Sequence, residues 1–212
     1  MKLFYAPQSP FARKVRAAAI EVGLDKDIEL MPAAVAPGRE NQVYAAKINP
    51  LRKIPALALD SGEVLVDSSV ICEYLDAKAG GGKLLPKDGE ARWRVLTQHA
   101  IAQGMTDAMI LVRYETSLRP EPQRWPVWVE DQWDKFWTGL AWFETRARDV
   151  LPMPPRQLDV AQLALAAVLG YVDFRFPQSG WQRRAPQVAR WFSQASALPA
   201  LRETVPYDPP PA

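Results

Sequence analysis

The chain has 212 residues, 48% of them hydrophobic, and its 26 Lys and Arg against 24 Asp and Glu give a formal net charge of only +2. This length and apolar content allow a packed core in one large domain or two small ones, and the balanced charge gives no reason to expect a nucleic-acid or acidic-membrane partner. One cysteine and one histidine exclude a disulfide framework, a cysteine-based zinc site and a multi-histidine centre, so no metal is expected.

The first residues run directly into a strand-like segment, 2–5, without the layout of a signal peptide. No later apolar run approaches the roughly 18 residues of a membrane span. We therefore expect a cytoplasmic protein with no membrane partner.

Ser9 and Pro10 are typical of a helix start, because serine caps free N–H groups and proline at the first helical position loses no hydrogen bond. Gly23 is the expected C-terminal stop. An apolar stripe runs along this helix at Phe11, Val15, Ala18 and Val22. Three cations lie mostly off the stripe and are expected on a solvated or interdomain face: Arg13, Lys14 and Arg16.

A second strand is predicted at 27–31, followed by a loop at 32–39 and a short, weak helix at 40–47. Because a helix separates the first two strands, we expect these strands to pair in parallel.

The stretch 49–75 is predicted to form a hairpin that leads directly into a helix. Short apolar runs at 56–59 and 64–66 flank turn residues, and Asp67 and Ser68 are candidates for the helix N-cap. Free N–H groups at such a helix start can bind an anion, and the Asp67 carboxylate can hold an ammonium. A ligand with both an amino and a carboxylate group would suit this pair, although an ordinary helix start explains the same residues.

Ile54-Pro55 precedes the first strand of the hairpin. If this bond is cis, it turns the backbone of Ile54 outward, where its N–H and C=O could pair with an extended, peptide-like ligand. The sequence leaves the isomer open.

Glycines at 80–82 mark a linker, and helical periodicity begins at 89. Two long helices are predicted, from 89 to about 117 and then to about 149, each ended by prolines. Asp159 and Gln162 form a capping box at the start of a helix that is apolar nearly all round and therefore buried. Two shorter helices are expected at 186–195 and 199–204, before a loosely ordered tail from Pro206.

The predicted architecture therefore has two domains joined by a linker. Residues 1–78 form an α/β domain with the order β-α-β-α-β-β-α, which is the thioredoxin-like arrangement. Residues 79–88 form the linker, and residues 89–212 form an all-α helical bundle.

Three motifs in this order resemble those of bacterial glutathione transferases: S-P-F-A-R-K-V-R at 9–16, N-P-L-R-K-I-P at 49–55 and V-D-S-S-V-I-C-E-Y-L at 66–75. The resemblance covers nearly the whole chain and is nearest to small serine-type members without an assigned substrate. Arg52 departs from the family pattern, which has a turn glycine there, and Asp67 stands where glutamate is commoner.

The resemblance implies roles for individual residues. Ser9 would donate a hydrogen bond to the glutathione sulfur, and Ile54, before the cis-proline Pro55, would pair with the cysteinyl backbone. Asp67 would hold the γ-glutamyl ammonium and Ser68 its carboxylate. Further expected contacts are Lys53 near the glycine end of glutathione and Phe11, Arg113 and Tyr114 on the substrate side.

The implied function is a glutathione transferase with glutathione as co-substrate, a small hydrophobic electrophile as partner substrate and a homodimeric assembly. A glutathione-dependent isomerase or dehalogenase, which returns the thiol, is the alternative enzyme. A non-catalytic protein-binding member of the fold is the third reading. Three of these side chains also have simpler interpretations: a helix cap only for Ser9, a buried apolar residue for Cys72 and a structural residue for His99.

Overall fold

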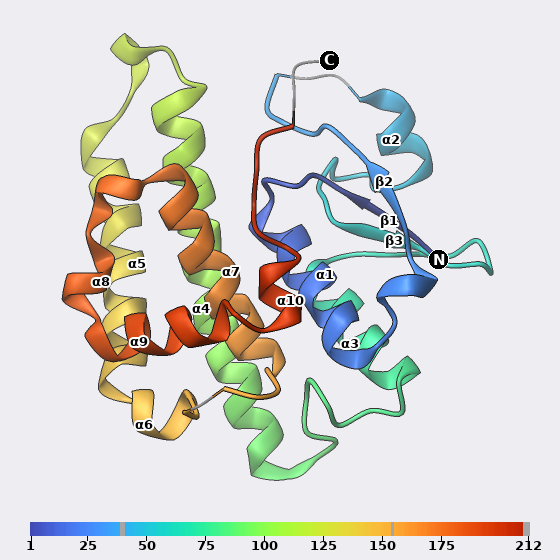
Figure 1. Cartoon of the computed structure of the whole chain (residues 1–212). Helices are drawn as coiled ribbons and strands as arrows, with labels where there is room; N and C mark the ends of the chain where they lie inside the picture. The colour runs from blue at the N-terminus through green and yellow to red at the C-terminus, as the bar shows by residue number, and fades with distance from the viewer. Residues whose placement is uncertain (39–40, 154, 210–212) are drawn as a thin grey trace.

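The computed structural model describes residues 1–38, 41–153 and 155–209 (Figure 1). Some predicted features lie outside these residues: the end of the loop at 39, the helix start at 40, part of the proline run at 152–155 and the chain end at 210–212.

The N-terminal half contains a four-stranded mixed sheet with helices packed on it. Its elements are β1 Lys2–Tyr5, α1 Pro10–Val22, a 3₁₀ turn Asp25–Asp27, β2 Glu29–Pro32, α2 Gln42–Lys47, β3 Ala56–Ala58, β4 Val64–Leu65 and α3 Ser68–Lys78. The strand order is β2-β1-β3-β4, with β1 and β2 parallel and the other pairs antiparallel. The predicted thioredoxin-like arrangement is confirmed.

Local sequence explains where α1 and α3 begin. The side chain of Ser9 accepts a hydrogen bond from the N–H of Ala12, and Pro10 occupies the first turn of α1. Gly23 ends this helix with a left-handed backbone, φ +80°. Asp67 caps α3 by accepting from the N–H groups of two residues of its first turn.

The C-terminal half is entirely helical. Its elements are α4 Gly89–Ser117, a 3₁₀ turn Glu121–Gln123, α5 Pro126–Thr145, α6 Ala147–Val150, α7 Val160–Arg175, a 3₁₀ turn Pro177–Ser179, α8 Trp181–Arg184, α9 Pro186–Ala195 and α10 Pro199–Arg202. The predicted second long helix is too long, because Arg146 leaves the helical conformation and separates α5 from α6. The last helix is shorter than predicted and ends at Arg202.

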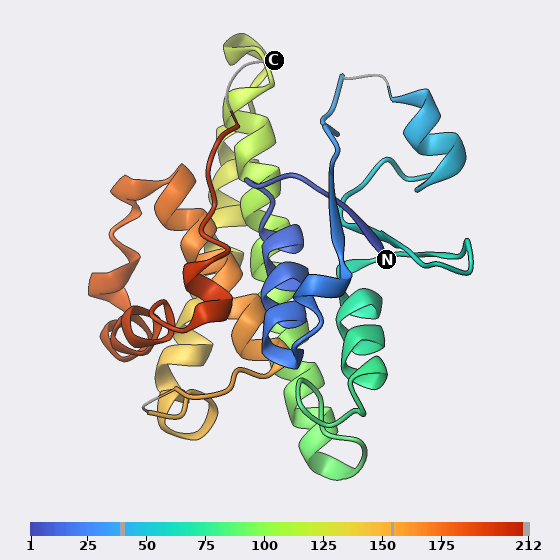
Figure 2. The same ribbon diagram turned by 45° about the vertical axis from the view of Figure 1, so that its right-hand side comes forward.

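Helix α7 is the core of the molecule and lies between α1 and the bundle (Figure 2). Its first thirteen residues, Val160–Val172, are all buried. The predicted capping box is present: Gln162 N–H donates to the Asp159 carboxylate over 2.8 Å, and Asp159 N–H donates to the Gln162 side chain over 3.1 Å. A helix that is apolar all round is thus fixed at its start and surrounded by other elements.

The C-terminal segment differs from expectation. Asp208 accepts two hydrogen bonds from the Arg175 guanidinium, over 2.8 and 2.6 Å. The prediction of a loose tail is therefore wrong for its described part, because a bidentate ion pair fastens it to the end of α7.

Among the described residues, no single helix is both long and apolar enough to cross a membrane. One bent pair in that part of the chain, Val160–Arg175 and Pro177–Arg184, is long and apolar enough only when its two segments are taken together, and they meet at 96°.

Candidate functional site

Three predicted site segments meet at one edge of the sheet because of the strand registers. β1 ends at Tyr5 and leads to Ser9, and its partner β3 starts at Ala56, opposite Phe4. Since β3 and β1 are antiparallel, the end of β1 and the start of β3 share an edge. β4 ends at the same edge, with Leu65 opposite Leu57, and leads directly into α3.

Ser9 stands half-buried at the N-terminus of α1. Its Oγ accepts from Ala12 N–H over 3.3 Å. A hydroxyl has one proton to donate and two acceptor positions, so this capping bond leaves the Ser9 proton available to another acceptor.

The loop before β3 holds the Ile54–Pro55 peptide bond in the cis form. Ile54 is outside the strand ladder, which begins at Ala56. Arg52 has a positive φ of +53° and is the single non-glycine residue with this backbone in the described part of the chain. Buried Asn49 fixes the loop by donating to the Lys53 carbonyl over 2.8 Å and accepting from Leu51 N–H over 3.0 Å.

Asp67 and Ser68 form the start of α3. One carboxylate oxygen of Asp67 accepts from Ser69 N–H over 2.9 Å, and the side chain remains exposed. Ser68 is only 2% exposed, and its Oγ has no hydrogen-bond partner among the described residues. A buried, unpartnered hydroxyl at a helix N-terminus is a donor available to an anion.

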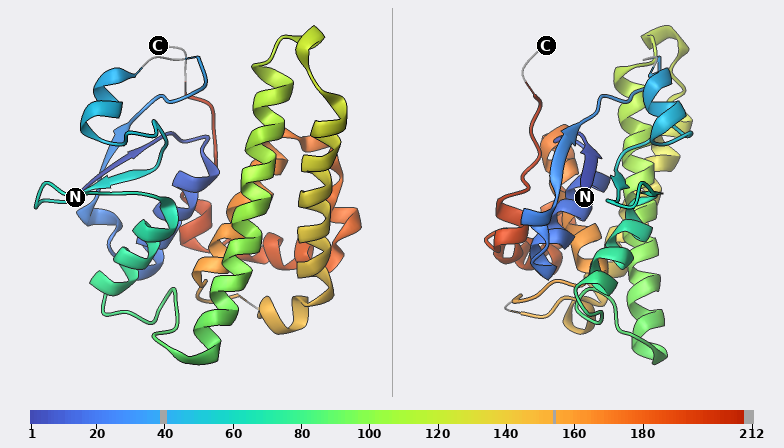
Figure 3. Two further views of the ribbon diagram at one scale, coloured as in Figure 1. Left: turned by 180° about the vertical axis from the view of Figure 1, so that it is seen from behind. Right: turned by 90° about the vertical axis from the view of Figure 1, so that its right-hand side faces the viewer.

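Helix α4 faces this edge from the other half of the molecule (Figure 3). Asp107 on α4 lies close enough to the predicted site that its pKa, raised by partial burial, is lowered by Lys53 and Lys14 and raised by Asp67. The side chain of Lys53 is exposed. The positive charge of Lys53 and the negative charge of Asp107 therefore lie near each other at the predicted site.

The three predicted substrate-side residues, Phe11, Arg113 and Tyr114, are all half-buried. Arg113 donates to Ser117 on the same face of α4. Burial raises the pKa of Tyr171 to about 12, with Arg175, Arg113 and Tyr114 as charged or polar neighbours. The end of α4, the end of α7 and the C-terminal segment therefore converge.

The end of α7 also lies toward the N-terminus of α1. Arg13 on α1 donates to the Ala166 carbonyl, and Leu158, before α7, lies at Glu21 near the other end of α1. The two helices therefore run antiparallel, and the last turns of α7 lie beside the first turn of α1. This brings the convergence of α4, α7 and the C-terminal segment toward Phe11 and Ser9.

Arg13 and Lys14 on α1, expected on a solvated or an interdomain face, lie on the interdomain one. Arg13 is 4% exposed and donates to the carbonyls of Ala166 on α7 and Leu201 on α10. Lys14 is 2% exposed and lies between α1 and α4. The solvated alternative is therefore wrong for both, and they occupy the interface between the halves. Spacing alone did not reveal this, because an off-stripe position becomes buried when two different elements cover the two sides of a helix.

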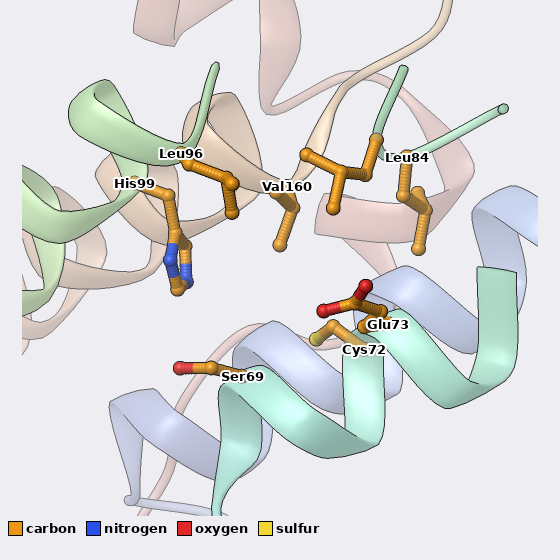
Figure 4. Close-up of a pocket in the computed structure, with 8 residues that line it drawn as sticks. Ser69, Cys72, Glu73, Leu84, Leu96, His99 and Val160 are labelled. Carbon is orange, nitrogen blue, oxygen red and sulfur yellow. The ribbon is translucent and has the colours of Figure 1, made fainter. Parts of the chain in front are cut away.

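A small cavity of about 40 Å³ lies between α3 and α4 (Figure 4). Ser69, Cys72 and Glu73 project from α3 toward the His99 ring, which points down from α4. Pockets for ligands of drug or cofactor size are several hundred Å³, so this space suits a water molecule and not a tripeptide. Cys72 is buried, and burial raises its thiol pKa to about 11. In the described part of the chain no group of three or more His, Cys, Asp or Glu side chains is placed to hold a metal ion.

Comparison with known proteins gives two family matches. Residues 3–83 match the N-terminal domain of glutathione S-transferase and residues 126–193 match its C-terminal domain. The Escherichia coli K12 protein YibF, an uncharacterised glutathione-transferase-like protein, is 29% identical over 207 residues, which is 97% of this chain and 98% of YibF. The maleylacetoacetate isomerase of Pseudomonas aeruginosa is 33% identical over 94 residues, 44% of each chain.

A solved structure extends this likeness to the whole chain. A glutathione transferase family member from Pseudomonas fluorescens Pf-5, crystallised with bound glutathione, is 41% identical, with a TM-score of 0.92 over 97% of this chain and 98% of that one. That relative has also been crystallised with S-(propanoic acid)-glutathione. An identity of 41% over nearly the whole length of both chains shows that this chain belongs to the glutathione transferase family.

Proposed function

We propose that this chain is a serine-type glutathione transferase, which binds glutathione at the sheet edge and activates its thiol for attack on a small electrophile. The observation that carries the proposal is the meeting at one edge of Ser9, the cis Ile54–Pro55 bond and the Ser68 hydroxyl, which has no hydrogen-bond partner among the described residues. Glutathione bound to the Pseudomonas fluorescens relative supports the same ligand here.

In this proposal glutathione lies along the edge as an extended tripeptide. The γ-glutamyl carboxylate takes the Ser68 hydroxyl and the N-terminus of α3, and the γ-glutamyl ammonium takes Asp67. The backbone of Ile54 pairs with the cysteinyl residue, and Lys53 approaches the glycine carboxylate. The thiol then lies at Ser9.

Two interactions would stabilise the thiolate. A free thiol has a pKa of about 8.5, and lowering it by about two units requires about 2.7 kcal/mol. A hydrogen bond from the Ser9 hydroxyl to an anion contributes about 1.5–3 kcal/mol, and the N-terminus of α1 adds about 0.3–1 kcal/mol. The two are sufficient together, and neither requires a metal.

The electrophile would bind where Phe11, Arg113 and Tyr114 meet the end of α7 and the C-terminal segment. The S-(propanoic acid)-glutathione bound to the relative supports room beside the sulfur for a small substituent. We further propose that the protein is a homodimer, as the family resemblance implies, and that it is cytoplasmic, as its N-terminal sequence and apolar runs suggest.

An isomerase that returns glutathione is the second candidate, because the match to a maleylacetoacetate isomerase covers 94 residues at 33% identity. Measuring free thiol during turnover separates the two. A transferase consumes one glutathione for each electrophile, whereas an isomerase leaves the glutathione concentration unchanged. Absence of binding at millimolar glutathione would contradict both and favour a non-catalytic role.

A further inference from the structure

Lys14 is a buried cation without a carboxylate partner in the described part of the chain. Its Nζ lies 2.9 Å from His99 Nε2 and 2.8 Å from Gln103 Oε1. Gln103 is uncharged, and burial lowers the pKa of His99 to about 3, so His99 is neutral near pH 7. Because a charge beside neutral groups is costly, burial lowers the pKa of the Lys14 ammonium, and a carboxylate brought near it would raise that pKa again and stabilise the charged form.

The position of Lys14 is fixed by three helices. His99, Gln103 and Asp107 occupy successive turns on one face of α4, and the Lys14 ammonium contacts the first two. On α3, buried Ser68 and Cys72 stand four residues apart on one face, and His99, which contacts the Lys14 ammonium, lines one cavity with Ser69 and Cys72. The ammonium therefore lies behind the first turn of α3.

That turn already has two features that favour an anion. Ser68 is only 2% exposed, and its hydroxyl has no hydrogen-bond partner in the described residues. The helix N-terminus adds partial positive charge in the same place. The protonated form of Lys14 adds positive charge behind this turn, in surroundings that screen it less than water does.

We propose that Lys14 is a positioning residue for glutathione, whose buried ammonium draws the γ-glutamyl carboxylate to the Ser68 hydroxyl and the N-terminus of α3. This inference rests on the proposed glutathione site and adds a residue from α1 to it. Lys14 acts through space and does not touch the ligand. His99 and Gln103 hold the ammonium in place without neutralising it, so its field remains available to the incoming carboxylate.

The test removes the charge and keeps the length of the side chain. Lys14→Met is compared with Lys26→Met, which removes the same charge from an exposed position. Calorimetry measures the affinity for S-methylglutathione, which cannot form a thiolate, and for the same compound without the α-carboxylate of its γ-glutamyl residue.

For Lys14→Met we expect about a five- to fifteen-fold loss of affinity for S-methylglutathione, from a charge acting over roughly 10 Å in a partly screened interior. The loss should disappear with the analogue that lacks the carboxylate. Lys26→Met should bind both ligands like wild type. Because Lys14→Met leaves His99 Nε2 and Gln103 Oε1 without their donor, its thermal stability should fall, and the affinities are compared at a temperature at which both variants are folded.

Two results would overturn the proposal: unchanged affinity of Lys14→Met for S-methylglutathione, or an equal loss with both ligands. If Lys14→Met does not fold, Lys14→Gln, which retains a polar contact to α4, provides the same comparison. Failure of wild type to bind S-methylglutathione would contradict the proposed function itself, and the two failures are thus distinguishable.

Discussion

At the residue scale, the proposed function gives Ser9 a structural and a chemical role together. Its Oγ accepts the N–H of Ala12, which caps α1, while its proton can be donated elsewhere. The interpretation as a cap and the interpretation as a thiol-activating residue therefore use different parts of the same hydroxyl. Removing Ser9 affects both roles, so only a property of the bound ligand, its thiol pKa, separates them.

Arg52 is strained at the residue scale. Its φ of +53° is a left-handed conformation that costs a residue with a Cβ roughly 1–2 kcal/mol. Arg52→Gly should therefore stabilise the protein by about 0.5–1 kcal/mol, after the extra flexibility that glycine gives the unfolded chain is subtracted. Chemical denaturation measures this difference.

The matched control is Arg52→Ala, which removes the same charge and keeps the Cβ. Its stability should not rise. If both variants become equally stable, the guanidinium and not the backbone conformation is responsible, and the account of strain is wrong. Equal changes in glutathione affinity for the two variants would assign any binding effect to the charge.

At the scale of elements, α1 and α7 pack through a glycine. A Cβ at Gly170 would lie 1.8 Å from Arg13 Nη1, and Arg13 is buried and hydrogen-bonded to two carbonyls. Gly170→Ala should destabilise the protein by about 2–4 kcal/mol, because Arg13 must move and lose these bonds. Thermal or chemical denaturation would show this loss.

Gly104→Ala is the control in the other direction. Gly104 is an exposed residue of α4 with no atom within 4 Å of an added Cβ. Alanine should stabilise this helix by up to about 1 kcal/mol. If Gly170→Ala were as harmless as Gly104→Ala, the close packing of Arg13 against α7 would be refuted.

The contact between α1 and α4 makes stability depend on pH through His99. Its pKa is lowered to about 3, first by burial and then by Lys14, from an ordinary value of 6.5. The folded state thus binds fewer protons than the unfolded state, and this contribution is complete above pH 6.5 and is lost as the pH falls toward 3. The other titratable groups near His99 are Asp67 and, across the small cavity, Cys72.

His99→Gln removes this titration and leaves a neutral acceptor for Lys14. The difference in unfolding free energy between wild type and His99→Gln should shrink by up to about 1.4 kcal/mol for each pH unit below 6.5. Parallel curves from neutral pH to about pH 4 would contradict a depressed pKa. His99 is the single histidine of the chain, so its proton resonances report the pKa directly.

The elements themselves were largely predictable because their signals are local. Ser9 and Gly23 mark the ends of α1, and the Asp159–Gln162 capping box marks the start of α7. The break at Arg146 was not predictable, because no proline or glycine stands there and the apolar pattern continues.

Long-range contacts were not accessible in the same way. The burial of Lys14 depends on α4 covering one side of α1, and its partners His99 and Gln103 lie 85 and 89 residues away. Asp208 pairs with Arg175, which lies 33 residues earlier, and Asp208 itself stands in a Pro-rich segment with no periodicity. Neither pairing leaves a local pattern that spacing could reveal.

At the scale of the whole molecule, the proposed site draws on both halves. The sheet edge supplies Ser9, Ile54 and Ser68, while α4 supplies the groups that hold Lys14 and the charge of Asp107 opposite Lys53. Of the residues proposed on the substrate side, Arg113 and Tyr114 come from α4 and Phe11 from α1. We therefore expect glutathione affinity to depend on contacts across the interface, and electrophile choice to depend mainly on the helical half.

The central claim is that this protein binds glutathione and holds its sulfur as a thiolate at Ser9. The direct measurement is a pH titration of the thiolate ultraviolet absorbance of bound glutathione, for wild type and Ser9→Ala. We expect a bound thiol pKa about two units below the free value of about 8.5 in wild type, and a rise of about one to two units in Ser9→Ala with binding retained. A bound thiol pKa near 8.5 in wild type, or the same lowered pKa in both proteins, would contradict the claim.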